Sequence, residues 1–435
     1  MSWLATLFAA EAIPSAITTY VALLIFMQMG MGWGASTLMA AMLMLPWTAR
    51  PLAETALARA GHLPLQLRTA EAALFAALVW LALSFTGPDG SVWHVAAALL
   101  AVAMLSAWHE IGSRHLYTRL LRRPMQRYFN LPKMVASQSV VVITYGVMIV
   151  GVGFLEVFYH NRRNAMTLSW STAVYVLAGF YLLLTLYNLI ALPAPARCHH
   201  RTTPLPAAGI APHAALGGDK RRQAVLAWAL MFAMLLPQAL MFHARVLFFV
   251  APRTQGGLGA TLQWLGLAQG TVGVIAFSAG LVLGYWLIIH GSATHRRRSR
   301  ATLDPATRRR ITRRALVAAT ALLPLSPLIY CHLAALLPST LLPLCVATGA
   351  AQFLFGFGLN ACAPLIARLS GHAYDNATGY LHVPAIALAM LLPSALAGTA
   401  LELTSFRTFF AIDAACIPLA WAAGARALRG ATTIC

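Results

Sequence analysis

Acidic residues are the scarcest part of this sequence, with 11 Asp and Glu against 31 Lys and Arg in 435 residues. Only 10% of the chain is charged, whereas a soluble domain carries about 25%. Such a chain has too little charge to cover a soluble surface, which argues against a soluble enzyme. The net charge of +20 would suit a nucleic-acid-binding protein, but 60% hydrophobic residues and a mean hydropathy of +0.71 argue against that class too.

The sequence also lacks the short motifs of several enzyme classes. No G-x-x-x-x-G-K-[ST] motif occurs, which argues against an ATP-driven pump. The absence of H-E-x-x-H and G-x-S-x-G argues against intramembrane protease or esterase chemistry. No two cysteines have the C-x-x-C spacing of a zinc site or redox motif, so we expect no metal, no cofactor and no catalytic residues. The cysteines are Cys198, Cys331, Cys345, Cys362, Cys416 and Cys435.

Long hydrophobic runs, by contrast, are abundant. A membrane-spanning helix needs about 20 mostly apolar residues, and small residues scattered through such runs allow close helix packing in lipid. We therefore expect an all-α membrane protein with twelve transmembrane helices. The runs lie at about 10–29, 36–57, 67–86, 92–112, 131–156, 168–192, 224–250, 260–289, 315–337, 340–366, 377–402 and 407–425.

The positive charges fall mainly on one side of these twelve runs. If the N-terminus is cytoplasmic, 26 of the 31 Lys and Arg residues lie in inner loops and tails and four in outer loops, with Arg245 left inside a span. This is the positive-inside pattern, and it predicts cytoplasmic N- and C-termini in a bacterial inner membrane. The basic loops should meet anionic lipid head groups. The arginine run at 292–314 fits this orientation rule better than a nucleic-acid site.

The chain divides into two halves. Residues 193–223 form the longest loop in the first two thirds, are rich in Pro and Gly, and leave six runs on either side. We expect one six-helix bundle over 1–192, a cytoplasmic linker over 193–223, and a second bundle over 224–435 with a basic insertion at 292–313. Pro14 and Pro237 occupy matching places in the first run of each half, as in transporters built from structural repeats.

Polar residues inside spans are costly and are therefore candidate functional residues. His109 and Glu110 are adjacent, about 100° apart on a helix, so they cannot both face one cavity squarely. Glu110 either pairs with Arg114 four residues later or acts as a proton-titrating or solute-contacting carboxylate. Arg50 either pairs with Glu54 or meets an anionic group.

Arg245 has no obvious local partner, so it either contacts an anionic solute or extends to the outer interface. The remaining polar residues in spans either link helices or line a cavity, and we expect about a third to line one. They are Thr18, Thr19, Tyr20, Gln138, Tyr145, Gln238, Gln269, Gln352, Asn360, Tyr380 and His382. From these we select Tyr20, Gln138, Gln238, Gln352, Asn360 and His382 as solute-binding or coupling residues, together with His109, Glu110, Arg50 and Arg245.

Several stretches together resemble one family. In the first half they are Ile13-Pro14, 45–52 (LPWTARPL) and 106–111 (SAWHEI, similar to S-A-T-H-D-I). In the second half they are 256–259 (GGLG), 270–276 (GTVGVIA), 352–358 (QFLFGFG) and 390–393 (MLLP) with Ala397-Gly398. In this order, over about 400 residues, they resemble the AmpG-like, muropeptide-permease-like branch of the major facilitator superfamily in its Bacteroidetes type.

The resemblance implies a monomeric secondary transporter that moves a small solute by alternating access, coupled to protons, with a muropeptide- or siderophore-like substrate. Two departures weaken the case for proton coupling: Arg114 stands where the family has a second acid, and Ala58 stands where it has an acid in span two. The alternative function is a membrane receptor or complex subunit that kept the fold and lost the coupling acids.

Overall fold

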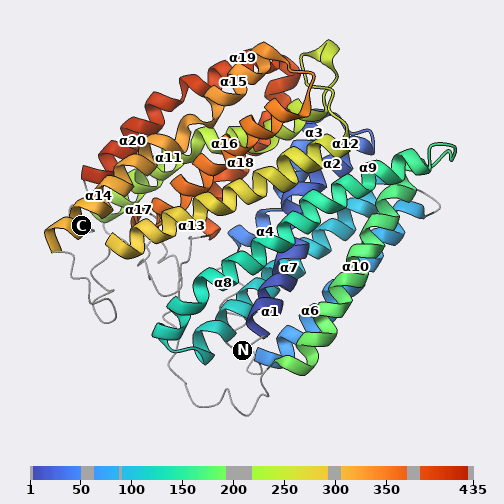
Figure 1. Ribbon diagram of the computed structural model, residues 1–435, viewed down its shortest axis with the longest axis horizontal. Helices are drawn as coiled ribbons and strands as arrows, with labels where there is room; N and C mark the ends of the chain where they lie inside the picture. Colours follow the sequence, from blue (N-terminus) through green and yellow to red (C-terminus); the bar gives the residue numbers. More distant parts are fainter. Residues whose placement is uncertain are drawn as a thin grey trace.

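A computed structural model describes residues 3–49, 63–87, 91–192, 218–291, 305–369 and 383–429, and all described elements are helices and turns. Helices from the first part of the chain gather into one group and helices from the second part into another (Figure 1). The start of α1 and the end of α20 lie at the same end of the bundle of helices.

The first group begins with a helical segment in three pieces, followed by long helices. Its elements are α1 Trp3–Ala16, η1 Ile17–Val21, α2 Ala22–Gln28, α3 Trp33–Met42, α4 Leu45–Thr48, α6 Leu63–Thr86, α7 Val92–Leu120, α8 Arg123–Val141, η2 Val142–Val147, α9 Met148–Phe158 and α10 Ala165–Ala191.

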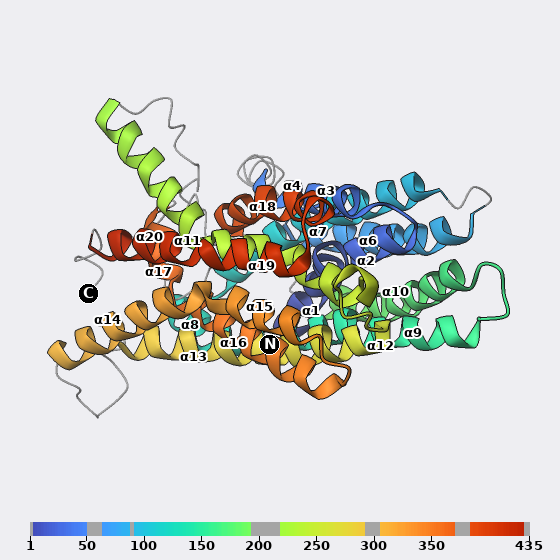
Figure 2. The ribbon, with the colours of Figure 1, turned by 90° about the horizontal axis from the view of Figure 1, so that it is seen from above.

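The second group begins with one long helix, α11, and the start of α11 projects beyond the neighbouring helices (Figure 2). Its elements are α11 Gly218–Val250, η5 Arg253–Gln255, α12 Leu262–Leu265, η6 Gly266–Gly273, α13 Val274–Gly291, α14 Pro305–Leu322, η8 Leu323–Leu325, α15 Ser326–Leu336, α16 Leu341–Ala361, α17 Ala363–Leu369, α18 Val383–Leu403, α19 Phe406–Ala415 and α20 Ile417–Arg429.

Eleven helical segments of the described residues are long and apolar enough to cross a membrane. Each overlaps one of the predicted runs. The twelfth prediction, 36–57, lies partly outside the described residues, and its described part forms α3 and α4. α11 begins at Gly218, within the expected linker, and α14 begins at Pro305, within the expected basic insertion. The end of the expected linker and the end of the basic insertion are therefore helical.

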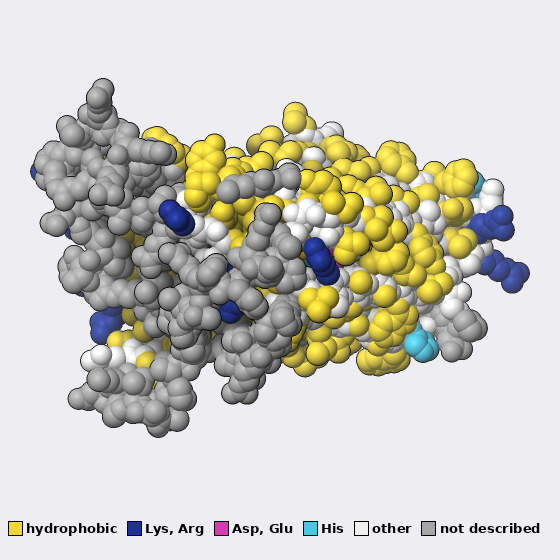
Figure 3. All heavy atoms as spheres, turned by 90° about the horizontal axis from the view of Figure 1, so that it is seen from below, with side chains coloured by type: hydrophobic (Ala, Val, Ile, Leu, Met, Phe, Trp, Pro, Cys, Tyr) yellow, Lys and Arg dark blue, Asp and Glu magenta, His cyan; other side chains and the backbone are white. Residues whose placement is uncertain are grey.

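The outer surface matches a membrane environment. Hydrophobic side chains cover much of the described surface in this view, and Lys and Arg side chains are few on it (Figure 3). Large apolar side chains such as Ile190 and Leu403 are more than 80% exposed. Together with eleven helices long and apolar enough to cross a membrane, such exposure indicates a surface that contacts lipid. The chain is thus a multi-pass membrane protein.

The two groups of helices pack closely at the end opposite the termini, where α3 lies against α18. Across this contact the Gly34 amide donates a hydrogen bond to Glu402 Oε1 at 2.8 Å, and Thr37 Oγ1 donates to the Ala395 carbonyl at 2.9 Å. Any side chain at Gly398 would collide with the Trp33 carbonyl oxygen. Glycine is therefore required for this close approach.

A second close contact joins the groups nearer the middle, where η2 packs on η6. A side chain at Gly270 would collide with the Tyr145 carbonyl oxygen, and one at Gly146 with the Thr271 hydroxyl. Small residues on both helices allow their backbones to touch, as is common between helices in lipid. This contact holds Tyr145 and Gln269 near the boundary between the groups.

Candidate functional site

The structure places the predicted site residues in separate locations. Arg50 and His382 lie outside the described residues. His109 and Glu110 lie inside the first group, whereas Tyr20 and Arg245 meet at the boundary between the groups. The remaining four, Gln138, Gln238, Gln352 and Asn360, lie elsewhere on the helices.

His109 belongs to a buried hydrogen-bonded network within the first group. Its Nε2 lies 3.2 Å from Glu71 Oε1, and both side chains have no exposed surface. Asn188 Nδ2 donates to the same Glu71 oxygen at 2.8 Å, and Thr6 Oγ1 donates to Asn188 Oδ1 at 2.7 Å. The network ties α1, α6, α7 and α10 together. Its hydrogen bonds lower the cost of burying Glu71 in an apolar bundle. Glu71 Oε2 and His109 Nδ1 have no hydrogen-bond partner among the described residues.

Glu110 faces a different set of neighbours, as its 100° separation from His109 requires. One carboxylate oxygen contacts the Arg114 guanidinium, and the other accepts a hydrogen bond from Trp47 Nε1 at 2.6 Å. The expected pairing with Arg114 is thus present. This pairing does not test a titrating role for Glu110, which stays a prediction.

Two further charged residues lie beside this pair. Glu11 Oε2 accepts a hydrogen bond from Ser113 Oγ at 2.5 Å. Lys133 Nζ lies over the rings of Phe8 and Tyr117, at 4.9 and 4.8 Å from their centroids. Cations are attracted to the faces of aromatic rings. Acids and bases from α1, α7 and α8 therefore share one cluster near the terminal end of the first group.

Arg245 forms the third location, at the boundary between the groups. It is buried, with 7% of its surface exposed, so it does not extend to the outer interface. Its guanidinium lies over the Phe242 ring at 5.4 Å from the centroid. It is also near enough to Tyr20, Tyr145 and Tyr330 to interact with them electrostatically.

Aromatic rings from both groups pack together around this arginine. Tyr20 stacks on Tyr145 at a centroid distance of 5.1 Å and contacts Phe242 at 6.0 Å. Tyr20 and Tyr145 come from the first group and Phe242 from the second. The arginine and these rings, with Tyr330, are called the Arg245 site below.

Polar atoms at the Arg245 site lack partners within the described part of the chain. Arg245 makes no ion pair there, and its Nε is buried without a hydrogen bond. The Tyr145 hydroxyl and Gln269 Oε1 are buried and unpaired as well, although Gln269 Nε2 donates to the Tyr330 hydroxyl at 3.0 Å. Buried polar atoms in native proteins are nearly always hydrogen-bonded, so a group of unpaired ones points to a ligand or water.

The backbone is irregular where it carries these residues. Tyr20 lies in η1, Tyr145 in η2 and Gln269 in η6, and all three segments are π-helical. Short π-helical segments inside α-helices are rare and occur often at functional sites. Three such segments that supply side chains to one place therefore mark the Arg245 site as the best candidate for ligand binding.

Most of the other predicted residues link helices. Gln238 Nε2 donates to the Leu323 carbonyl and to Ser326 Oγ, and Asn360 Nδ2 donates to the Leu281 carbonyl at 2.8 Å. Gln138 Oε1 accepts a long hydrogen bond from Ser278 at 3.4 Å, across the boundary between the groups. Gln352 is buried on α16 beside η6, where Gly273 lies close to it.

The list of expected site residues missed Glu11, Glu71 and Asp413. Asp413, on α19, is 1% exposed, and both carboxylate oxygens are buried without a hydrogen bond to a described residue. An acid inside a hydrophobic run was the available signal for all three. No cluster of potential metal ligands occurs among the described residues.

Neither a family model nor a curated protein matches this sequence. Solved structures do match it over nearly the whole chain. The nucleoside transporter NupG has 13% identity and a TM-score of 0.61, with 98% of each chain covered. A structure of proton dependent oligopeptide transporters has 11% identity and a TM-score of 0.59, with 98% of this chain and 96% of that chain covered.

A bacterial homolog of the human lysosomal transporter Spinster is similar too, with 12% identity, a TM-score of 0.57, and 98% of this chain and 97% of that chain covered. These likenesses show that the chain has the fold of major facilitator transporters. A likeness at this level of identity shows the fold alone, so membership of the major facilitator superfamily stays a prediction. The AmpG-like branch stays a prediction.

Proposed function

We propose that this protein is a secondary transporter that moves a small anionic solute across the bacterial inner membrane by alternating access. The observation that carries the proposal is Arg245, a buried cation at the boundary between the helix groups with no carboxylate partner among the described residues. A buried charge is costly unless it is paired. A carboxylate or phosphate of the solute would pair with it, and the surrounding rings would contact an apolar part.

The proposed architecture follows the sequence expectation. Residues 1–192 and 224–435 form two six-helix bundles joined by the linker 193–223, with twelve transmembrane helices and both termini in the cytoplasm. The unequal distribution of Lys and Arg supports this orientation. The close contact of α3 with α18 would then close the outer end, and transport requires that this contact open.

The proposed solute is muropeptide-like or siderophore-like, and the protein works as a monomer. Many molecules of both classes carry carboxylates, which suits a single buried arginine. Proton coupling is assigned to Glu110 and His109. Both lie in buried polar clusters of the first group, where a change of protonation would alter the packing of α1, α4, α6 and α7.

Uptake into proteoliposomes tests the transport function. The purified full chain is reconstituted and offered an anhydro-muropeptide, a ferric siderophore and an acidic dipeptide, with protein-free liposomes as the control. We expect uptake of at least one probe. Saturable binding of a probe with no uptake would instead support the receptor alternative.

Two substitutions test the coupling role. Glu110→Gln and His109→Ala should flatten the pH dependence of uptake, whereas His160→Ala, at an exposed histidine in the turn after α9, should leave it unchanged. If Glu110→Gln and His109→Ala both retain the pH profile of the wild type, the coupling role is wrong. The transport proposal would survive that result, because it depends on Arg245.

A further inference from the structure

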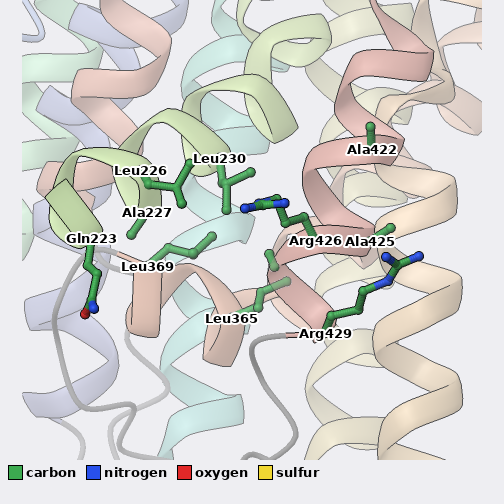
Figure 4. Close-up of a pocket in the computed structure, with 11 residues that line it drawn as sticks. Gln223, Leu226, Ala227, Leu230, Leu365, Leu369, Ala422, Ala425, Arg426 and Arg429 are labelled. Atoms are coloured by element: carbon green, nitrogen blue, oxygen red, sulfur yellow. The ribbon is translucent and has the colours of Figure 1, made fainter.

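A groove opens in the second group, beside the end of α20 (Figure 4). It lies between the start of α11, the short helix α17 and the end of α20, and its volume is about 800 Å³. This volume is within the range of small-molecule sites, roughly 300–1,000 Å³. The groove is distinct from the Arg245 site, and none of its lining residues contributes to that site.

The lining combines apolar side chains with arginine. Leu226 and Leu230 come from α11, Leu365 and Leu369 from α17, and alanines from α20 complete the apolar wall. Arg426 and Arg429 are the charged members of the lining, and no acid is among them. The Arg426 side chain is directed across the groove toward Leu226 and Leu230, whereas Arg429 is directed away from it (Figure 4).

The charge of Arg426 is not compensated by any described neighbour. Neither Arg426 nor Arg429 makes an ion pair or a side-chain hydrogen bond with another described residue. An arginine directed over leucine side chains presents several N–H donors to whatever occupies the groove. Phosphate is the anion that the arginine fork fits best, together with carboxylate.

The two long helices that line the groove also carry exposed apolar side chains. Val225 and Leu226 on α11 and Leu419 and Trp421 on α20 are each more than 40% exposed. A soluble anion would gain nothing from these side chains, whereas an acyl chain would cover them. The groove thus joins an anion-binding group to a hydrocarbon-binding surface, at the end of the helices where lipid head groups lie.

We propose that this groove is a binding site for an anionic phospholipid. The phosphodiester contacts the Arg426 guanidinium, and an acyl chain packs on Leu226 and Leu230 and continues along the exposed apolar side chains. The cytoplasmic leaflet, where we expect this end of the protein to lie, is the leaflet richer in anionic lipid in many membranes. The site is independent of the proposed transport function.

Binding of defined lipids to the delipidated full chain in detergent tests the proposal. The probes are dioleoyl-phosphatidylglycerol, dioleoyl-phosphatidylcholine and glycerol phosphate. Bound lipid is counted by native mass spectrometry, and the midpoint of thermal unfolding is measured alongside. We expect wild-type protein to bind phosphatidylglycerol in preference to phosphatidylcholine, and glycerol phosphate to leave the midpoint unchanged.

Three variants locate the site. Arg426→Gln should weaken phosphatidylglycerol binding about fivefold, the loss expected for one cation near a lipid surface. Ala422→Trp should weaken it by filling the groove with no change of charge. Arg313→Gln is the matched control, because it removes one exposed arginine from α14 outside the groove, and should bind as the wild type does.

The proposal is overturned if Arg426→Gln and Ala422→Trp bind phosphatidylglycerol as tightly as the wild type. It is also overturned if phosphatidylcholine binds equally well, or if glycerol phosphate reproduces the stabilisation, since the groove would then be a site for soluble anions. A loss of binding in Arg313→Gln equal to that in Arg426→Gln would show a general charge effect and overturn it too.

Discussion

Buried charged side chains have hydrogen-bond or ion-pair partners among the described residues at Glu71 and Glu110 in the first half, but not at Arg245 and Asp413 in the second half. In the first half, Glu71 and Glu110 each have partners: His109 and Asn188 surround Glu71, and Arg114 and Trp47 hold Glu110. In the second half, Arg245 and Asp413 are equally buried, and neither makes an ion pair with a described residue.

The paired charges of the first half connect its helices, whereas Arg245 and Asp413 in the second half have no ion-pair partner among the described residues. A compensated buried acid stabilises the packing of its helices only as long as its partners remain. An uncompensated one costs stability, and a protein retains such a cost mainly where function requires it. The first half therefore supplies polar clusters that connect its helices, and the second half contributes the charge that a solute would neutralise.

The largest effect should come from Arg245. Arg245→Gln removes the charge that we propose pairs with the solute, and uptake of the transported probe should fall at least about 30-fold, as for the loss of a buried charged partner. The measurement is initial uptake into proteoliposomes. Arg407→Gln, at an exposed arginine at the start of α19, is the control and should transport normally. Equal uptake by Arg245→Gln and the control would show that the unpaired charge of Arg245 does not bind the solute.

Glu71→Gln should give the next largest effect, on stability. The amide keeps the shape of the side chain but loses the charge-assisted hydrogen bonds with His109 and Asn188. We expect the free energy of unfolding to fall by about 2 kcal/mol. Thermal unfolding of the purified protein measures this, and an unchanged midpoint would show that the network contributes nothing to the fold.

Asp413→Asn is the matched change in the second half and should act in the opposite direction. Because no described group donates a hydrogen bond to Asp413, a neutral amide is cheaper to bury than the carboxylate. The midpoint of unfolding should rise, by an amount corresponding to about 1 kcal/mol. If the midpoint of unfolding fell as far as it does in Glu71→Gln, the Asp413 carboxylate would have a stabilising partner, and the contrast with Glu71 would be wrong.

Thr6→Val should have the smallest effect. Thr6 lies at the edge of the Glu71 network, where its hydroxyl donates to Asn188 Oδ1 at 2.7 Å. Loss of this neutral, partly buried hydrogen bond should lower the free energy of unfolding by about 0.5 kcal/mol, the low end for a hydrogen bond. Thr86→Val, at an exposed threonine at the end of α6, should cause no loss. A decrease in the free energy of unfolding equal to that of Glu71→Gln would show that the Thr6–Asn188 hydrogen bond stabilises the fold as much as the Glu71 hydrogen bonds do.

Much of the fold could be predicted from the sequence. Hydrophobic runs of about 20 residues located eleven of the membrane helices to within a few residues at most ends, because length and hydropathy are local properties. The starts of α11 and α14 were harder to predict. At both places the helix begins in a charged stretch before the hydrophobic run, so hydropathy does not indicate where the helix starts.

The site could be predicted only in part. Arg245 and Tyr20 stood out as polar residues in apolar runs, but their meeting with Tyr145 and Tyr330 depends on how the two halves pack. The sequence showed neither the three π-helical segments nor the sharing of one network by Glu71 and His109. Gln238 and Asn360 looked identical to ligand-binding residues in sequence, and the structure shows them joining helices.

The central claim is that Arg245 binds an anionic group, and pairs of solutes that differ in one charge test it most directly. Thermal stabilisation of the purified protein is measured with each probe as the free acid and as its neutral amide or ester, in wild type, Arg245→Gln and Arg407→Gln. We expect a probe to stabilise the protein only as the acid, and only in wild type and Arg407→Gln. Equal stabilisation by the neutral form, or stabilisation retained in Arg245→Gln, would contradict it.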